Sequence, residues 1–236
     1  MLVAAAVCPC PPLLVPEVAA GAATELDAAR AACLDAVGVL AAARPDLLIA
    51  VGPAGAAHRG THPEGTTGSF SGFGVDLRVR LGTSDARGGR ELPPSLAVAA
   101  WLLERAEWAG SPVEGLGVGE PLEPERCLAA GQELAARTER VALLVMGDGS
   151  ACRTLKAPGY LDERAAGFDA AAARALGAAD VAALKALDVR LAYELQAAGR
   201  APWQVLAGAA EGMEPGGQLL YADAPYGVGY YVATWT

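Results

Sequence analysis

Four residues in the middle of the chain, Gly147-Asp148-Gly149-Ser150, combine a carboxylate and a hydroxyl with two glycines. They follow the apolar run 141–146, which predicts a buried strand that delivers a polar turn to the edge of a sheet. Because α/β proteins bind ligands at the carboxyl ends of such strands, Asp148 and Ser150 are candidate catalytic residues. Both side chains are equally suited to capping the next turn by accepting backbone N–H groups.

Cationic and aromatic side chains further along the chain are candidates for substrate binding. Arg153 and Lys156, just after the turn, could bind an anionic substrate or could be solvated like most surface cations. Tyr226, in the glycine-rich segment 223–231, could line a pocket for a planar ligand or pack on a sheet face.

Reactive sulfur and nitrogen atoms lie nearer the amino terminus. Cys10 follows the first apolar run, where a histidine could lower its pKa and make it a nucleophile; a small buried thiol is the alternative. His58 and His62 lie in a long polar segment, 52–74. Together with Cys10 they offer ligands suited to zinc, and alone they could bind substrate or be solvated.

Apolar periodicity predicts the elements that position these residues. Residues 2–7 and 46–51 are typical of buried strands, and 22–43 have helical spacing with Thr24 as a candidate N-cap. A strand, a helix and a second strand form a βαβ unit, which predicts parallel pairing of the two strands. The prolines in 8–17 predict an extended loop between the first strand and the helix.

The rest of the chain continues the alternation of strands and helices. We expect a half-exposed strand at 75–81, a turn at 84–91, helices at 93–109, 123–137, 162–176, 179–198 and 202–210, and strands at 113–118, 141–146, 218–223 and 229–235. Neither a low-complexity linker nor an internal repeat interrupts this pattern. The sequence therefore predicts an α/β fold, a single domain over 1–236 with a mixed, mostly parallel central sheet and helices on both faces.

Composition narrows the classes of partner. The chain has 236 residues, of which 53% are hydrophobic, so it can bury an extensive core. A formal net charge of -9 disfavours a nucleic-acid partner, and no apolar run is long enough to span a bilayer. Five cysteines, an odd number, do not indicate a disulfide framework. We expect a cytoplasmic protein with reduced thiols and neither a membrane nor a nucleic-acid partner.

The order of four segments resembles the catalytic-subunit fold of class III extradiol ring-cleavage dioxygenases, the LigB-like superfamily that includes Memo proteins. The segments are 10–17, 68–74, 147–150 with 157–159 and 168–169, and 230–235. The resemblance covers almost the whole chain, so it implies one LigB-like domain. It also implies an oxygenase in which histidines and a carboxylate hold Fe(II), which binds a catecholate and O2 together.

The positions that the resemblance assigns to metal ligands and the proton-handling histidine hold other residues in this chain. Cys10, Ala54, Ala151 and Ala198 stand there. Alanine cannot ligate a metal, so we predict that the ancestral iron site has been lost.

Three hypotheses follow. The leading one is an extradiol dioxygenase-like protein that binds or transforms a small aromatic or anionic molecule in the ancestral pocket. The second is a non-catalytic protein-binding or assembly module, acting as a homo-oligomer or with a partner subunit. The third is a zinc-dependent hydrolase built on Cys10, His58 and His62.

Overall fold

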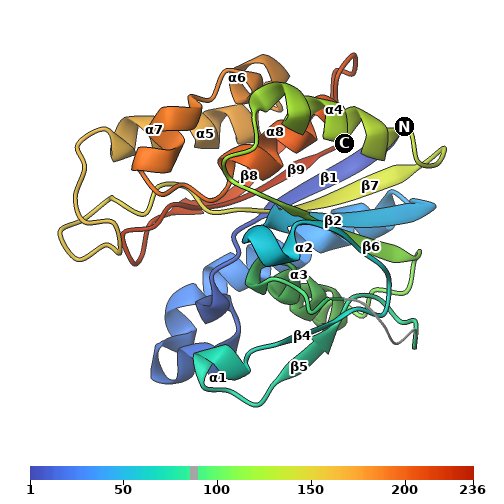
Figure 1. Ribbon diagram of the computed structural model, residues 1–236, viewed down its shortest axis with the longest axis horizontal. Coiled ribbons are helices and arrows are strands. Elements are labelled where there is room, and N and C mark those ends of the chain that lie inside the picture. Colours follow the sequence, from blue (N-terminus) through green and yellow to red (C-terminus); the bar gives the residue numbers. More distant parts are fainter. Residues whose placement is uncertain (86–89) are drawn as a thin grey trace.

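A mixed sheet runs through the centre of the molecule in the computed structural model, which describes residues 1–85 and 90–236 (Figure 1). Within these residues, seven strands pair in the order β3-β6-β2-β7-β1-β9-β8. The strands are β1 (Leu2–Cys8), β2 (Leu47–Pro53), β3 (Gly60–His62), β6 (Val113–Val118), β7 (Val141–Met146), β8 (Gly217–Asp223) and β9 (Tyr230–Trp235). The inner strands β1, β7, β2 and β6 are parallel, and β3, β9 and β8 pair antiparallel.

Helices cover both faces of this sheet (Figure 1). On one face lie α1 (Pro16–Ala19), α2 (Asp27–Ala42) and α3 (Pro94–Arg105), together with a hairpin of β4 (Thr67–Ser69) and β5 (Arg78–Arg80). On the other lie α4 (Pro124–Ala135), α5 (Ala165–Gly177), α6 (Val181–Lys185), α7 (Val189–Glu194) and α8 (Arg200–Ala209). The predicted mixed, mostly parallel sheet with helices on both faces is therefore confirmed.

The inner strands are apolar on both sides because each face of the sheet packs against helices. In β7 all six residues are buried, and alternate side chains enter different cores. Ala142, Leu144 and Met146 belong to the core under α2 and α3, whereas Val141, Leu143 and Val145 belong to the core under α5 and α8. The strand therefore reads as a continuous hydrophobic run.

The expected pairing of the first two strands is wrong in one respect. β1 and β2 are parallel, but β7 lies between them and pairs with both. The most apolar strand of the chain thus takes the centre of the sheet, where both of its edges are hydrogen-bonded. Its following turn consequently emerges between the ends of β1 and β2.

The helix expected at 22–43 begins later than predicted. Residues 20–26 form a 3-10 helix, and α2 starts at Asp27 without a side-chain cap, so Thr24 does not cap it. The buried Arg30 holds this entry, because its guanidinium donates to the carbonyl oxygens of Leu14 and Ala23. A tertiary contact therefore decides where the helix begins.

The single helix expected at 179–198 is two short helices, α6 and α7. Asp180 accepts the N–H of Ala183 at 2.9 Å, and Asp188 accepts the N–H of Leu191 at 2.8 Å. Each aspartate thereby caps a new helix and separates it from the preceding turn. The two caps explain the break, which hydrophobic spacing alone does not reveal.

Loops expected to lack structure contain short elements. A 3-10 helix at Pro12–Leu14 and α1 interrupt the proline segment 8–17, and β3 and β4 lie in the polar segment 52–74. The strand expected at 75–81 is shortened to β5, which pairs with β4 outside the main sheet. Of the turn expected at 84–91, residues 86–89 lie outside the described part of the chain. No helix in the described residues is both long and apolar enough to cross a membrane.

We predict that Gly131 sets the distance between α4 and α8. A Cβ atom at Gly131 would lie 2.0 Å from the carbonyl oxygen of Val205, so Gly131→Ala must push the helices apart. We expect the free energy of unfolding in urea to fall by about 1–3 kcal/mol. The control is Gly38→Ala in α2, where a Cβ meets no atom within 4 Å; it should raise stability by about 0.5–1 kcal/mol. Equal effects of both substitutions would contradict the prediction.

Candidate functional site

The carboxyl ends of β1 and β7 meet at one edge of the sheet. The N–H of Gly147 donates to the carbonyl oxygen of Cys8 at 3.0 Å, which extends the pairing of the two strands into their loops. One step further, the N–H of Cys10 donates to Asp148 Oδ1 at 2.8 Å. Two candidates that lie 138 positions apart in the chain are thus brought together, as the parallel sheet requires.

Asp148 is half-buried, and its environment favours the neutral acid. Burial raises the pKa of its carboxyl from the ordinary 3.8 to about 7, although the hydrogen bond from Cys10 lowers it. The Cys10 side chain is a second hydrogen-bonding partner of this carboxyl. Asp148 can therefore exchange a proton near neutral pH with a molecule that reaches this edge.

The Cys10 thiol is nearly enclosed, with 7% of the residue exposed. Burial, followed by the negative charge of Asp148, raises its pKa well above the ordinary value. A nucleophilic cysteine needs the opposite shift, because the thiolate is the reactive form. The geometry therefore fits the alternative reading of Cys10 as a small buried thiol.

Ser150 points into the protein and is completely buried. Its N–H and its hydroxyl each donate to the carboxylate of Asp169 at 2.8 Å. Asp169, which is 1% exposed, also pairs with Arg153 Nη1 at 3.1 Å. Ser150 thus holds the turn against α5 as a hydrogen-bond donor, which differs from the expected cap that accepts a backbone N–H.

The two glycines of the turn are required by close approach. A Cβ atom at Gly147 would lie 2.6 Å from the Cα of Gly199, and one at Gly149 would lie 2.8 Å from Asp169 Oδ1. Any larger residue would displace the backbone or the carboxylate that holds Ser150. The motif is therefore explained by packing as well as by the position of Asp148.

The histidines do not join Cys10. His62 is 1% exposed on the edge strand β3, and its Nε2 is hydrogen-bonded to the carbonyl oxygen of His58 at 2.9 Å. Across the residues that the structure describes, no three His, Cys, Asp or Glu side chains gather so that they could hold a metal ion. The expected zinc site of Cys10, His58 and His62 is therefore not formed, because His62 lies on β3 at the far edge of the sheet and His58 in the 3-10 helix just before it.

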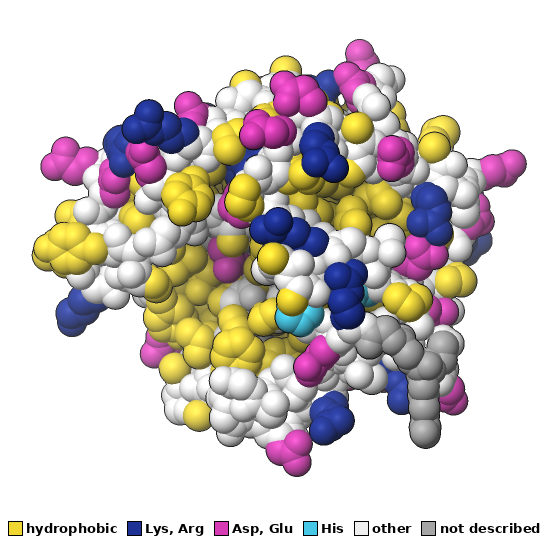
Figure 2. Space-filling model, in the orientation of Figure 1, with side chains coloured by type: hydrophobic (Ala, Val, Ile, Leu, Met, Phe, Trp, Pro, Cys, Tyr) yellow, Lys and Arg dark blue, Asp and Glu magenta, His cyan; other side chains and the backbone are white. Residues whose placement is uncertain are grey.

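A cavity of about 520 Å³ opens at this edge of the sheet. It is lined by Pro53, Glu120, Ala192, Tyr193, Glu194, Gln196, Ala197 and Ala198, and we call it the strand-end cavity. The backbone of Asp148 lies next to this lining, because its carbonyl oxygen accepts the N–H of Gly199 at 2.8 Å. Figure 2 shows that this side of the molecule is hollowed and that hydrophobic side chains gather in the hollow.

Glu120 and Arg200 are functional candidates that the sequence analysis did not identify. Glu120 follows β6, and both of its carboxylate oxygens are buried. Arg200, which is 1% exposed, places Nε 3.6 Å from Glu120 Oε1. Burial raises the pKa of Glu120 to about 7 against the opposing effect of Arg200. In the sequence, the position of Glu120 just after the apolar strand 113–118 could have identified it as a candidate.

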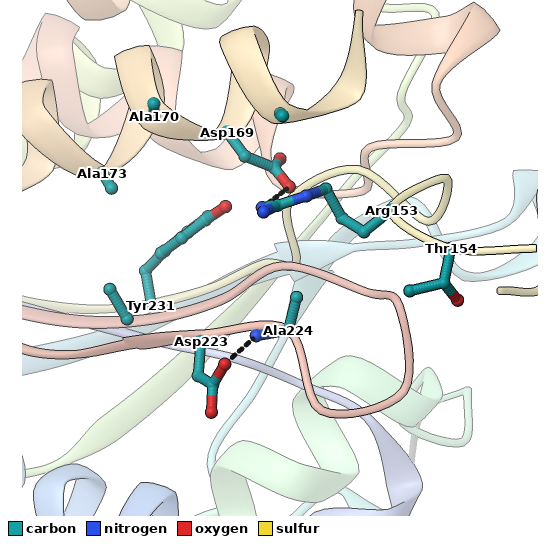
Figure 3. Close-up of a pocket in the computed structure, with 10 residues that line it drawn as sticks. Arg153, Thr154, Asp169, Ala170, Ala173, Asp223, Ala224 and Tyr231 are labelled. Carbon is teal, nitrogen blue, oxygen red and sulfur yellow. Dashed lines mark hydrogen bonds and ion pairs between the residues drawn. The ribbon is translucent and has the colours of Figure 1, made fainter. Parts of the chain in front are cut away.

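The remaining candidates lie apart from the strand-end cavity. Lys156 is exposed and makes no ion pair within the described chain. Tyr226 lies in the turn between β8 and β9, with its hydroxyl buried. Arg153 lines a second cavity, drawn in Figure 3, whose walls come from α5 and the ends of β8 and β9.

Comparison with known proteins identifies a structure with a similar fold but does not identify a family. No protein-family profile matches the chain, and no curated protein sequence is detectably similar. The structure is similar to the crystal structure of uncharacterized protein JW3007 from Escherichia coli K12, with a TM-score of 0.54 and 14% sequence identity. The superposition covers 98% of this chain and 99% of that one. At this identity the similarity shows a shared α/β fold.

We predict that Asp148 makes folding stability depend on pH. Asp148 ionises near the ordinary pKa of 3.8 in the unfolded chain but only near pH 7 in the folded chain. The free energy of unfolding therefore falls as the pH rises from about 4 to about 7. Relative to Asp148→Asn, which keeps the oxygen that Cys10 contacts, the wild type should lose about 1–3 kcal/mol of unfolding free energy over this interval.

The pH effect is measured by urea unfolding at pH 4.5 and pH 8. The control is Asp35→Asn at an exposed position of α2, for which we expect no comparable change. A difference between wild type and Asp148→Asn that stays constant with pH would show that the folded-state pKa is not raised.

Proposed function

We propose that this chain binds a small hydroxylated aromatic molecule at the strand-end cavity and that Asp148 exchanges a proton with its hydroxyl. The proposal keeps the pocket of an extradiol dioxygenase-like protein and assigns it chemistry that does not use the ancestral iron. The observation that carries it is Asp148 itself: a half-buried carboxyl with a pKa of about 7 just beyond the carboxyl end of β7.

The size and composition of the cavity support a small, mainly apolar ligand. A volume of about 520 Å³ lies within the usual range for ligand pockets. Alanines at 192, 197 and 198 leave room for a planar ring, and Gln196 offers a polar contact. The wall therefore provides an apolar surface with a few polar groups, which suits a compact aromatic body.

The residues present do not fit the iron that the resemblance implies. Ala54, Ala151 and Ala198 offer no metal ligand, and the Cys10 thiol is buried and hydrogen-bonded to Asp148. The buried acids with raised pKa values, Asp148 and Glu120, are not joined by a third ligand within the described residues. We therefore derive no step through iron.

The proposed chemistry of Asp148 follows from its hydrogen bonds. The N–H of Cys10 donates to Oδ1, so the carboxyl keeps one orientation at the strand end. Above pH 7 the carboxylate accepts the ligand hydroxyl, and below pH 7 the neutral acid can donate. The arrangement can thus act as a general acid or base in one place.

Calorimetric titration with catechol in metal-free buffer tests the proposal. We expect binding that is about 3–10-fold tighter at pH 8 than at pH 6, because a charged acceptor forms the stronger hydrogen bond. Asp148→Asn should remove this pH dependence, since the amide does not ionise over the interval. Ala198→Leu should weaken binding at least about tenfold by filling the cavity.

The matched control for cavity filling is Ala57→Leu, an exposed alanine outside the cavity, which should bind catechol like the wild type. Failure of catechol to bind, or binding that Ala198→Leu leaves unchanged, would refute the proposed site. Anaerobic loading with Fe(II) that gives stoichiometric iron and opens the catechol ring would show that the iron chemistry is retained.

Exposed hydrophobic side chains favour self-association as a second candidate function. Leu155, Tyr160 and Tyr193 are 62%, 63% and 70% exposed. Arg164 and Glu194, paired at 2.7 Å, join the loop that carries the first two to α7, which carries the third. Large exposed apolar side chains on neighbouring segments often mark an interface. The partner we infer is a second copy of this chain.

Light scattering during size-exclusion chromatography measures the oligomeric state. A dimer in the wild type that becomes monomeric in Tyr193→Ser would support this second candidate, since the substitution removes apolar contact area. A monomer at all protein concentrations would exclude it.

A further inference from the structure

A second cavity, of about 400 Å³, lies between α5 and the ends of β8 and β9. The residues that form its walls include Arg153, Asp169, Ala170, Ala173, Ala222 and Tyr231 (Figure 3). None of the residues that line this cavity lines the strand-end cavity. The two cavities are therefore separate, and the proposed function makes no use of this one.

Small apolar side chains line the cavity on both of its sides. Ala166, Ala170 and Ala173 follow one another at intervals of four and three residues, so they share one face of α5. On the sheet side, Ala222 lies opposite Tyr231 in the register of β8 and β9, so the two side chains project from the same face. Ala166, Ala170 and Ala222 are exposed. A molecule can therefore enter from solvent and place a small apolar group between the helix and the sheet.

Arg153 supplies the cavity with a cation that has unused hydrogen-bond donors. Its side chain is 34% exposed, and its Nη1 donates to Asp169 Oδ2 at 3.1 Å. Its remaining guanidinium N–H groups make no hydrogen bond to a residue that the structure describes. In Figure 3 the guanidinium lies between α5 and the sheet, close to Tyr231. Because the contact with Asp169 holds the planar group, its other donors keep a geometry that suits a carboxylate.

Asp169 is enclosed by donors and offers the cavity no second binding group. It is 1% exposed, and it accepts both the N–H and the hydroxyl of Ser150 at 2.8 Å, in addition to Arg153. The hydroxyl of Tyr231 lies on the same side: burial, followed by the negative charge of Asp169, raises the pKa of Tyr231 above its ordinary value. The phenol therefore keeps its proton at neutral pH and adds no negative charge to the cavity.

Asp223, at the end of β8, also leaves the charge of this cavity unchanged. It lies opposite Tyr230 in the register of β8 and β9, so its carboxylate is on the other face of the sheet from Tyr231. Figure 3 shows this carboxylate beneath the strands, on the far side from Arg153. Among the described residues that line the cavity, Arg153 thus provides the accessible charged group on the side of α5.

The pairing of Arg153 with Asp169 decides which class of anion fits. A ligand on the guanidinium is attracted by Arg153 and repelled by the carboxylate 3.1 Å from Nη1. A single carboxylate can accept two of the remaining N–H groups, whereas every further negative charge, as in phosphate or a dicarboxylate, adds to the repulsion. The alanines on both sides favour an apolar remainder.

We propose that the cavity under α5 is a binding site for a small monocarboxylate, with its carboxylate on the free donors of Arg153 and its alkyl group between the alanines of α5 and β8. The site is independent of the strand-end cavity and of the hydroxylated aromatic molecule proposed there.

Ligand-observed NMR titration of the purified full chain with butyrate tests the proposal. We expect saturable binding, which Arg153→Gln should weaken at least about tenfold by removing the charge-assisted hydrogen bonds. Ala170→Leu fills the cavity without changing a charge and should weaken binding at least about threefold. The matched controls are Arg174→Gln and Ala171→Leu, at exposed positions of α5 outside the cavity; both should bind like the wild type.

The wild type also allows a test in which only the ligand changes, so a poorly folded variant does not decide the outcome. Butyramide has the shape of butyrate without its charge and should bind at least about tenfold more weakly. Acetate lacks two methylene groups that contact the alanines and should bind about 3–10-fold more weakly. Inorganic phosphate should bind more weakly than butyrate because of its second charge.

The outcomes that would overturn the proposal are equally specific. They are the absence of saturable butyrate binding, equal binding of butyramide, tighter binding of phosphate, and butyrate binding that both Arg153→Gln and Ala170→Leu leave unchanged. Ala198→Leu, which fills the strand-end cavity, should leave butyrate binding unaltered. A loss of butyrate binding in that variant would place the ligand in the strand-end cavity and would also overturn the proposal.

Discussion

The turn after β7 is held from both sides by carboxylates, and the arrangement of the site depends on it. Its own Asp148 accepts the N–H of Cys10 from the end of β1, whereas Asp169 from α5 accepts the N–H and hydroxyl of Ser150. The first contact ties two strand ends together, and the second anchors the turn to the helical layer. One cavity adjoins each contact, because the turn separates the space beside Ala198 from the space beside Arg153.

Burial of acids is the common electrostatic feature of the strand-end region. Asp148 and Glu120 both have pKa values raised to about 7, chiefly because water is excluded from their surroundings. Burying a carboxyl with incomplete hydrogen bonding costs stability, so such groups tend to mark sites of function. Asp169 differs, since two donors from Ser150 and the guanidinium of Arg153 satisfy its oxygens. Its role is therefore to hold the turn.

Some features of the fold and the site were predicted correctly from the sequence, and others were not. The strands of the sheet core and the position of Asp148 at a strand end were predicted correctly, because burial on both faces leaves a continuous apolar run. The start of α2 was predicted too early, because it depends on Arg30, whose guanidinium donates to carbonyl oxygens outside the helix. The partnership of Glu120 with Arg200 was missed as well, because the two residues are 80 positions apart and no spacing rule links them.

The sequence by itself determined the α/β alternation, the apolar strands and the glycine turn with its carboxylate, since these depend on local periodicity and backbone sterics. Only the tertiary structure decided that β7 separates β1 from β2, that Ser150 faces Asp169, and that His62 lies far from Cys10. It also decided which residues line the two cavities. The physical reason is that strand order and long-range contacts depend on which surfaces bury each other, and local patterns do not encode that choice.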